Sequence, residues 1–212
     1  MNIRDLRQDY KRSCLDEDDS GNDPIVFFHQ WLDEAIKGEV PDPTAMSLST
    51  VSSDGRPSSR MVLLKGVENE QFVFYTNYES RKGEQLKVNP YASLLFFWPQ
   101  LERQVRIEGK AELTDSHESD RYFMSRPLES RLSALVSPQS RVISGRSELE
   151  ILVEHARAEF RNKEMRRPEH WGGYALIPEL IEFWQGRTGR LHDRIRYRRL
   201  SGSEWVKERL AP

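Results

Sequence analysis

The sequence predicts an α+β protein built around a small antiparallel β-barrel, with helices at its periphery. Most of the chain consists of short segments in which apolar and polar residues alternate, and segments with a helical period are inserted between them. A chain of 212 residues can form one substantial core, which buries roughly 70% of the unfolded surface. Because the sequence has no internal repeat and no low-complexity linker, we expect a single domain over residues 23–212.

The charge balance and the cysteine count limit the classes of function. The chain has 32 basic and 34 acidic residues and a net charge of -2, which argues against a general nucleic-acid binder. The single cysteine, Cys14, excludes an internal disulfide and is typical of a reducing compartment. The N-terminus is charged, and no apolar stretch is long enough to span a membrane. We therefore expect a cytoplasmic protein without nucleic-acid or membrane partners.

Residues 1–22 are predicted to be a mobile N-terminal segment, because they are polar and end in an acidic run that repels itself. A helix then begins with Asp23 as its N-cap and Pro24 at its first position, and Gly38 ends it. Its apolar stripe comprises Ile25, Phe28, Leu32, Ala35 and Ile36.

The central part of the chain is predicted to form five strands and one helix. Ser53-Asp54-Gly55-Arg56 has the composition of a hairpin turn between the first two strands. Ser80 is expected to cap the helix, which Pro90 ends near Asn89. The strands are expected at 45–53, 58–67, 71–76, 91–98 and 103–113.

The last part of the chain is predicted to begin with helices and to end with strands. A helix over 115–125 is followed by a short helix that opens at Pro127. Ser147 and Glu150 form a capping box for a long helix over 148–163. The apolar stripe of this long helix is Leu149, Leu152, Val153, Ala156 and Phe160. Strands are expected at 171–177, 180–184 and 190–199.

The segment 181–194 is the most informative part of the chain for function. If its second half is extended, Arg190, His192 and Arg194 project from one face of a strand. Two guanidiniums and an imidazole on one face form a donor-rich cationic surface that suits an anionic, planar or phosphorylated ligand. The alternative is a basic edge strand that is merely solvated.

Three further clusters carry groups that bind anions. Arg60 and Lys65 are five residues apart on a predicted strand, so in a regular strand they face opposite sides and can serve two different anions. The segment Tyr75 to Lys82 places hydroxyls and two cations at a helix N-terminus, where free backbone N–H groups favour phosphate. In the third cluster, a phenol, a guanidinium and a hydroxyl stand near the start of another helix, on Tyr122, Arg126 and Ser130.

Each of these clusters also has an ordinary structural explanation. Charged strand ends, a simple helix cap and an amphipathic helix with one exposed arginine account for them without any ligand. Gln104 and the pair Gln139-Ser140 offer donors and acceptors for the edge of a heterocyclic ring, but isolated glutamines alone predict nothing.

Other chemistries are not indicated. The five histidines have no metal-binding spacing, and we predict no metal site. The chain lacks a Gly-x-Ser-x-Gly elbow and a Gly-x-Gly-x-x-Gly loop after a strand. Cys14 is a poor candidate for a nucleophile because it lies in a segment that we expect to be mobile and acidic.

Taken together, these motifs resemble the pyridoxine/pyridoxamine 5′-phosphate oxidase family, whose members are FMN enzymes of vitamin B6 metabolism. The resemblance runs through nearly the whole chain, and the segment 182–194 fits the defining pattern of the family without a gap. The other matching segments are 43–46, 55–65, 74–82, 101–109, 122–127, 139–140 and 209–212.

The resemblance implies an antiparallel split β-barrel of the FMN-binding, Greek-key type, and a homodimer with FMN at the subunit interface. The cofactor-binding residues that it implies in one chain are Arg60, Met61, Val62, Leu63, Leu64, Lys65, Tyr75, Thr76, Arg81, Lys82 and Gln104. It implies that the partner chain supplies Gln139, Ser140, Trp184 and Arg194. The FMN phosphate would be held by Arg60, Arg81, Lys82 and Ser140.

The resemblance also implies a substrate site and an activity. Lys65, Tyr122, Arg126 and Ser130 would bind the substrate phosphate, and the N-terminal residues Arg7 to Tyr10 would close over the substrate. Arg190 and His192 would be the catalytic residues and would also contact the substrate, with Arg190 orienting it and His192 handling a proton or a hydrogen bond. The expected reaction is the oxidation of pyridoxamine or pyridoxine 5′-phosphate to pyridoxal 5′-phosphate by O2, with release of H2O2, and of ammonia from the amine.

Two other functions remain open at this point. The chain could be a split-barrel flavin reductase that uses a nicotinamide, although a nicotinamide needs no small phosphate pocket beside Tyr122 and Arg126. It could also be a carrier that binds FMN or pyridoxal 5′-phosphate without turnover.

Overall fold

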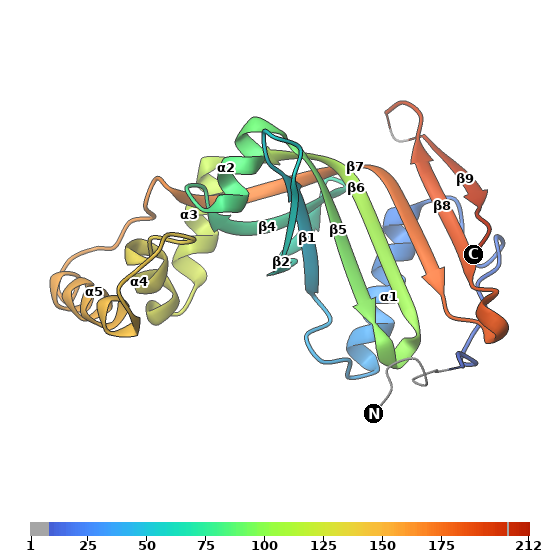
Figure 1. Cartoon of the computed structure of the whole chain (residues 1–212), viewed down its shortest axis with the longest axis horizontal. Helices are drawn as coiled ribbons and strands as arrows, with labels where there is room; N and C mark the ends of the chain where they lie inside the picture. The colour runs from blue at the N-terminus through green and yellow to red at the C-terminus, as the bar shows by residue number, and fades with distance from the viewer. Residues whose placement is uncertain (1–8, 203) are drawn as a thin grey trace.

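The computed structural model describes residues 9–202 and 204–212, which form one curled antiparallel sheet with helices around it (Figure 1). The sheet has nine strands in the order β2-β1-β5-β6-β7-β4-β3, and β8 and β9 extend it from β7. The strands are β1 (Ala45–Val51), β2 (Pro57–Leu63), β3 (Gly66–Glu68), β4 (Gln71–Asn77), β5 (Tyr91–Trp98), β6 (Arg103–Leu113), β7 (Trp171–Gln185), β8 (Asp193–Arg199) and β9 (Trp205–Arg209). The prediction of an α+β protein around an antiparallel half-barrel is confirmed.

The long strand β7 organises this sheet. Its first part pairs with β4 and its second part with β8, while β6 runs beside it along most of its length. We predicted two strands here, over 171–177 and 180–184, and that prediction was wrong, because β7 is continuous through Pro178. The ladder tolerates the proline because its register shifts between Glu108 and Gly109. A side chain at position 109 would place its Cβ 2.0 Å from the Ile177 carbonyl oxygen, so the close approach requires Gly109.

The helix α1 (Pro24–Lys37) provides most of the apolar cover for the inner face of the sheet. Asp23 caps it as predicted and accepts hydrogen bonds from the N–H groups of Ile25 and Val26. Phe28 is fully buried and packs against Phe72 and Phe96, at ring-centroid distances of 5.0 and 5.2 Å. Ile36, which we placed on the apolar stripe, is 52% exposed.

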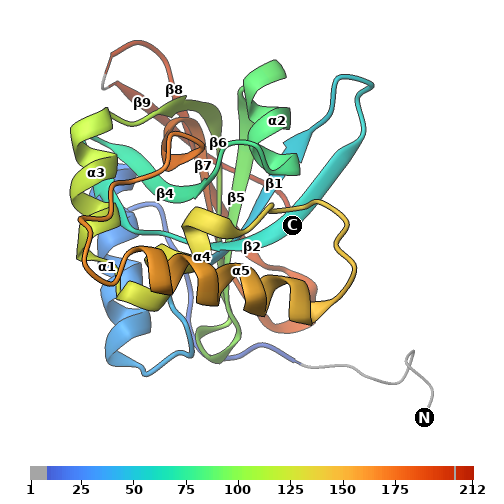
Figure 2. The ribbon, with the colours of Figure 1, turned by 90° about the vertical axis from the view of Figure 1, so that its left-hand side faces the viewer.

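The remaining helices are α2 (Arg81–Val88), α3 (Ser116–Ser125), α4 (Leu128–Val136) and α5 (Arg146–Glu159). The α4 and α5 helices lie side by side beyond one end of the sheet (Figure 2). Their inner sides form a second apolar cluster with Phe123, Met165 and Trp171. None of the helices in the described ranges is long and apolar enough to cross a membrane.

The start of α5 differs from the prediction. The helix begins at Arg146, so Ser147 lies inside it and does not cap it. Glu148 instead accepts hydrogen bonds from the backbone N–H and the hydroxyl of Ser144, at 2.8 and 2.7 Å. A serine followed by a glutamate correctly indicated a helix start, but a second serine nearby made its exact position ambiguous.

Part of the segment that we predicted to be mobile, residues 15–22, lies against the sheet before α1 begins. Leu15 and Ser20 are buried, and Arg209 contacts Glu17 through two nitrogen–oxygen pairs. The Tyr197 hydroxyl donates to the Ser20 carbonyl at 2.8 Å. Residues 15–22 are therefore packed on β8 and β9, because an acidic run that repels itself in isolation meets basic side chains here.

Candidate functional site

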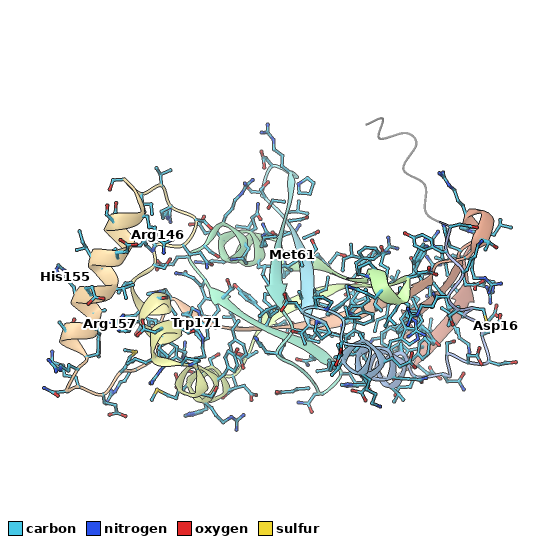
Figure 3. The ribbon with its side chains drawn as sticks, turned by 90° about the horizontal axis from the view of Figure 1, so that it is seen from below. Asp16, Met61, Arg146, His155, Arg157 and Trp171 are labelled. Carbon is cyan, nitrogen blue, oxygen red and sulfur yellow. The ribbon has the colours of Figure 1, made fainter. Side chains whose placement is uncertain are left out.

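A cavity of about 520 Å³ opens between β2, β4 and the helices α3 and α4. Met61 and Trp171, which are labelled in Figure 3, mark two of its walls. The predicted site residues in the lining are Arg60, Met61, Val62, Leu63, Lys65, Tyr75, Thr76, Lys82, Tyr122, Arg126, Ser130 and Gln139. The cavity therefore brings most of the predicted cofactor and substrate residues together.

Arg60 reaches this cavity from the edge strand β2, and neutral oxygen atoms hold its guanidinium. Its Nη1 donates to the Leu48 carbonyl at 2.9 Å and to the Thr50 hydroxyl at 2.7 Å, and its Nη2 donates to the Ser58 hydroxyl at 2.7 Å. Gln85 supports this arrangement, because its Oε1 accepts from both the Thr50 and the Ser58 hydroxyls. Burial, and secondarily the charge of Arg81, lowers the pKa of Arg60.

Lys82 is a buried cation at the start of α2. Ser80 caps this helix as predicted and accepts from the Gly83 N–H. The Lys82 ammonium donates to the Thr76 hydroxyl at 3.0 Å, to the Ser80 hydroxyl at 3.3 Å and to the Gln139 Oε1 at 2.8 Å. Burial, followed by the charge of Arg60, lowers the pKa of Lys82 to about 8.

In the described part of the chain, the cations of the cavity have no carboxylate partner. Within residues 9–202 and 204–212, the ion pairs include none with Arg60, Lys65, Lys82 or Arg126. Buried charges are normally paired, because an isolated one is costly. Lys82 is buried, and Arg60 and Arg126 are half-buried, so this group of cations can hold an anion.

The opposite wall of the cavity is aromatic. The rings of Tyr75 and Tyr122 stack at 3.9 Å, and Tyr75 also stacks on Trp171 at 5.5 Å. The Arg126 guanidinium lies 4.6 Å from the centre of the Trp171 ring, and its buried Nη1 has no hydrogen-bond partner in the part of the chain that the structure describes. Burial raises the pKa of Tyr75 to about 12, so its phenol stays protonated and can donate.

Trp171 is a site residue that sequence reasoning missed. We predicted it only as the first residue of a strand. A tryptophan at a strand start carries no sign that it will lie under Arg126, the residue that follows α3, 45 positions earlier in the chain.

Arg60 and Lys65 line the same cavity, although we expected them to face opposite sides of one strand. The reason is that β2 ends at Leu63, and the chain turns before β3. Leu64 then enters the core, where it is 5% exposed, so it does not line the cavity. Arg81 and Ser140 are also absent from the lining. Gln139 meets Lys82 within one chain, whereas we had expected a partner chain to supply it.

A second group of predicted residues lies away from the cavity. The side chains of Tyr10, Trp184 and His192 are in contact, with ring-centroid distances of 5.7, 5.9 and 4.7 Å between the three pairs. Gln104 on β6 and Arg194 on β8 are both in register with Trp184. We call these five residues the Trp184 cluster. Arg7, which we predicted to act with Tyr10, lies outside the described residues.

His192 has a defined hydrogen-bonding direction. The backbone N–H of Arg187 donates to its Nδ1 at 3.1 Å, so this nitrogen is the acceptor and the neutral ring carries its proton on Nε2. The Nε2–H group can therefore donate to a ligand.

The predicted strand over 190–199 begins only at Asp193. Residues Thr188–Arg190 form a short 3-10 turn, and both Gly189 and Arg190 have a φ of +62°. Arg190 is exposed at this turn. The basis of our prediction, that Arg190, His192 and Arg194 alternate along a strand, was therefore wrong, because only Arg194 lies in one.

Glu182 is the other site residue that the sequence did not reveal. Its carboxylate is 3% exposed and binds the Arg194 Nε at 2.8 Å and the Arg106 Nη2 at 2.6 Å. The hydrogen bond to Glu182 raises the pKa of Arg194. The segment 181–194 stood out for its cations, and nothing in the sequence indicated that its one glutamate would be buried between them.

The cavity and the Trp184 cluster are well separated in one chain. Trp171 and Trp184 are at opposite ends of β7, on the order of 40 Å apart for an extended strand. Met61 and Glu182 lie in one cross-strand row that passes through Ser47, Leu95 and Arg106, which corresponds to about 19 Å at four strand spacings. No residue of the Trp184 cluster lines the cavity.

Comparison with known proteins places this chain in a family. The curled half-barrel sheet is that of the split-barrel class, and a pyridoxamine 5′-phosphate oxidase-related, FMN binding protein from Nostoc punctiforme shares it, with a TM-score of 0.70 at 20% identity over 91% of this chain and 100% of the other. Residues 32–160 match the family model of pyridoxamine 5′-phosphate oxidase, and residues 171–212 match that of the pyridoxine 5′-phosphate oxidase C-terminal dimerisation region.

Relatives that match over nearly their full length indicate the same family. The chain is 54% identical to the pyridoxine/pyridoxamine 5′-phosphate oxidase of Pseudomonas putida, over 100% of this chain and 99% of the relative. It is 55% identical to that of Azotobacter vinelandii, over 99% and 98%. PhzG from Burkholderia lata, solved with tetrahydrophenazine-1-carboxylic acid, superposes with a TM-score of 0.87 at 32% identity, over 94% and 98%. The chain belongs to the pyridoxine/pyridoxamine 5′-phosphate oxidase family and is an oxidoreductase.

Proposed function

We propose that this enzyme oxidises pyridoxamine 5′-phosphate and pyridoxine 5′-phosphate to pyridoxal 5′-phosphate, with FMN as cofactor and O2 as electron acceptor. The alcohol and O2 would give pyridoxal 5′-phosphate and H2O2, and the amine would also consume water and release ammonia. Its role would be in the salvage and biosynthesis of vitamin B6. The observation that carries this proposal is the cavity, in which two groups of uncompensated cations can hold two phosphates.

The first group fits the phosphate of FMN. Arg60 and Lys82 are both oriented by neutral oxygens, which leaves their charges available to a dianion. Lys82 stands at the N-terminus of α2, where the helix dipole also favours an anion. Arg81 and Ser140 would add donors from just outside the cavity.

The second group fits the phosphate of the substrate. Lys65, Tyr122 and Ser130 line the cavity together with Arg126. The buried Arg126 Nη1 without a hydrogen-bond partner among the described residues is the polar atom that such a phosphate would satisfy. This second group of phosphate-binding residues distinguishes the proposal from a flavin reductase, because a nicotinamide does not require it.

The residues of this chain would bind and orient the substrate, and bound FMN would supply the capacity to accept two electrons and to pass them to O2. Arg190 would hold the substrate ring in position, and the His192 Nε2–H would donate a hydrogen bond near the reacting carbon. Tyr10, which lies over Trp184 and His192, would exclude water from this contact.

The separation of the cavity and the Trp184 cluster supports a homodimer with FMN at the subunit interface. The face of the sheet that carries Trp184 and Gln104 also exposes Met61 and Phe97, which are 65% and 52% accessible to solvent. Exposed apolar side chains on one face mark an interaction surface. A two-fold axis would place the Trp184 cluster of each chain against the cavity of its partner and form two equivalent sites.

A hybrid dimer tests the shared site. When a chain with Lys82→Met is produced together with a chain with Arg190→Ala, under separate affinity tags, the purified hybrid contains one intact site of two. We expect about half the activity of the wild-type dimer from this symmetry, although each parent dimer is nearly inactive. A hybrid that is no more active than its parents would show that cavity and Arg190 act within the same chain.

The function itself is tested by anaerobic mixing of the FMN-reconstituted protein with pyridoxamine 5′-phosphate. We expect the flavin absorbance to bleach and, on admission of air, to return with formation of pyridoxal 5′-phosphate and H2O2. Bleaching by NADPH alone would indicate a flavin reductase, and no bleaching by either compound would indicate a carrier.

The affinity for FMN should depend on pH through Lys82. Its pKa of about 8 in the ligand-free cavity is raised when a phosphate dianion stabilises the charged form, so binding takes up a proton above pH 8. We therefore expect the affinity to be constant from pH 7 to 8 and to fall by up to about tenfold per pH unit above it. Fluorescence titration measures this, and Lys82→Arg, which stays charged, should show a flat profile. An equal decline in both proteins would assign the pH dependence to another group.

A further inference from the structure

The two arginines at the ends of the proposed FMN site differ in the charge of the groups that bind them. In the cavity, the Arg60 guanidinium donates to neutral oxygens and has no carboxylate partner among the described residues, so its charge is available to a ligand. In the Trp184 cluster, the Arg194 guanidinium binds the buried carboxylate of Glu182 at 2.8 Å. The arrangement of Arg60 suits a phosphate. The Arg194–Glu182 pair, in contrast, has little net charge but still offers hydrogen-bond donors.

Glu182 fixes the direction of Arg194 as well as its charge. The Arg194 Nε donates to Glu182, and its Nη1 donates to the Ala211 carbonyl at 2.8 Å. A planar guanidinium that is held at two nitrogens has a fixed orientation. The Arg194 Nη2 makes no hydrogen bond to residues 9–202 or 204–212, so it is the donor that remains for a ligand.

The local charge around this donor is balanced. Glu182 also binds the Arg106 Nη2 at 2.6 Å, and Arg106 in turn contacts Glu108 at 3.1 Å. Two arginines and two glutamates thus form a neutral network on the outer face of the sheet. The buried position of Glu182, with a 3% exposed side chain, strengthens its interaction with Arg194, because little water screens it.

We propose that Glu182 is a positioning residue for the reaction: it orients Arg194 and cancels its charge, so that Arg194 presents one N–H group to an uncharged acceptor on the flavin ring. This inference rests on the proposed function, in which Arg194 contacts FMN. Under this inference the site has a charged end, which binds the phosphate, and a neutral end, which forms a hydrogen bond with the flavin ring.

The test compares Glu182→Gln with Glu208→Gln as a matched control. Glu208 lies on the same face of the sheet and binds Arg196 at 2.6 Å, but it has no ion pair with Arg194. Both variants replace one carboxylate by an amide in a ladder of the same sheet. Each is titrated with FMN and with riboflavin, which has the same ring but no phosphate, and the midpoint potential of bound FMN is measured.

Glu182→Gln should weaken the binding of FMN and of riboflavin by the same factor, about tenfold for one misdirected hydrogen bond. It should also raise the midpoint potential, because Arg194 is then an uncompensated cation beside a flavin that becomes more negative when reduced. Adding Arg194→Gln to Glu182→Gln should return the potential toward the wild-type value. Glu208→Gln should leave all three measurements unchanged.

Three results would overturn the inference. The first is a loss of FMN affinity without a loss of riboflavin affinity, which would place the effect at the phosphate end. The second is an unchanged or lower potential in Glu182→Gln, and the third is an equal effect of Glu208→Gln, which would indicate a general loosening of the sheet. If the wild-type protein binds neither flavin, the proposed function fails as well, so the two failures are distinguishable.

Discussion

Replacing Lys82 by methionine should remove most of the affinity for FMN without destabilising the flavin-free protein. Methionine has a similar length and no charge, so it fills the space at the start of α2. A hydrogen bond that involves a charged group contributes about 1.5–3 kcal/mol, which corresponds to a loss of roughly ten- to hundredfold in affinity. Fluorescence titration with FMN measures this loss.

The stability side of this prediction follows from the burial of Lys82. Lys82 is 8% exposed, and its hydrogen bonds to the described residues are all with neutral oxygens; burying a charge without a charged partner is unfavourable. We expect the Tm of flavin-free Lys82→Met at pH 7 to equal or exceed that of the flavin-free wild type. A loss of folding stability caused by a binding residue is typical of a trade-off between stability and function.

The pH dependence of this difference provides a control. The pKa of Lys82 is about 8 in the folded protein and about 10.4 in an unfolded chain. Below pH 8 the folded state carries the buried charge of Lys82, and the full destabilisation of the wild type by this charge is present. Between pH 8 and about 10.4 the folded state releases its proton first, so the stability of the wild type rises relative to the variant. The difference in Tm should therefore shrink from pH 7 to 9.5, and a constant difference would contradict this explanation.

Replacing Arg190 by alanine should reduce kcat/KM by about a hundredfold, because a small misplacement of the reacting groups costs that much in rate. FMN affinity should change little, since Arg190 lies in the 3-10 turn Thr188–Arg190 and not in the cavity. Steady-state kinetics with pyridoxamine 5′-phosphate and FMN titration measure the two quantities. Loss of kcat/KM and of FMN affinity in equal proportion would refute the orienting role.

The backbone of Arg190 offers a matched second variant. Its φ of +62° is unfavourable for every residue with a Cβ but not for glycine. Arg190→Gly should therefore lose as much activity as Arg190→Ala while being more stable, by about 1 kcal/mol. If the two variants differ in activity, the conformation of the turn contributes to catalysis in addition to the side chain.

The local features of the fold could be predicted from short stretches of sequence. Asp23 and Ser80 cap their helices as expected, because a cap depends on hydrogen bonds between residues two or three positions apart. The alternation of apolar residues located β1, β4, β5 and β6 to within two residues, because one face of each of these strands packs on the core. The chemistry of the site was also visible, since cations and hydroxyls recur at strand ends and helix starts.

The errors arose where distant parts of the chain meet. The strand β7 continues through Pro178 only because its register with β6 shifts there: Glu179 of β7 is the extra residue, and Gly109 of β6 allows the close approach. Arg60 and Lys65 share a cavity only because the core takes up Leu64 and turns the chain between them. Strand β9 was not predicted, because its five residues are defined by pairing with β8 and not by a pattern of their own.

The sequence by itself determined which residue types are available, where most helices and strands lie and which family the motifs resemble. Only the tertiary structure decided that the cavity and the Trp184 cluster stand apart in one chain, that the cations of the cavity lack carboxylate partners within residues 9–202 and 204–212, and that Glu182 is paired with Arg194. The physical reason is that caps and periodicity depend on neighbours within about one helical turn. Charge compensation and cavity shape, in contrast, depend on the cross-strand register, which brings together residues that are more than seventy positions apart, such as Arg106 and Glu182.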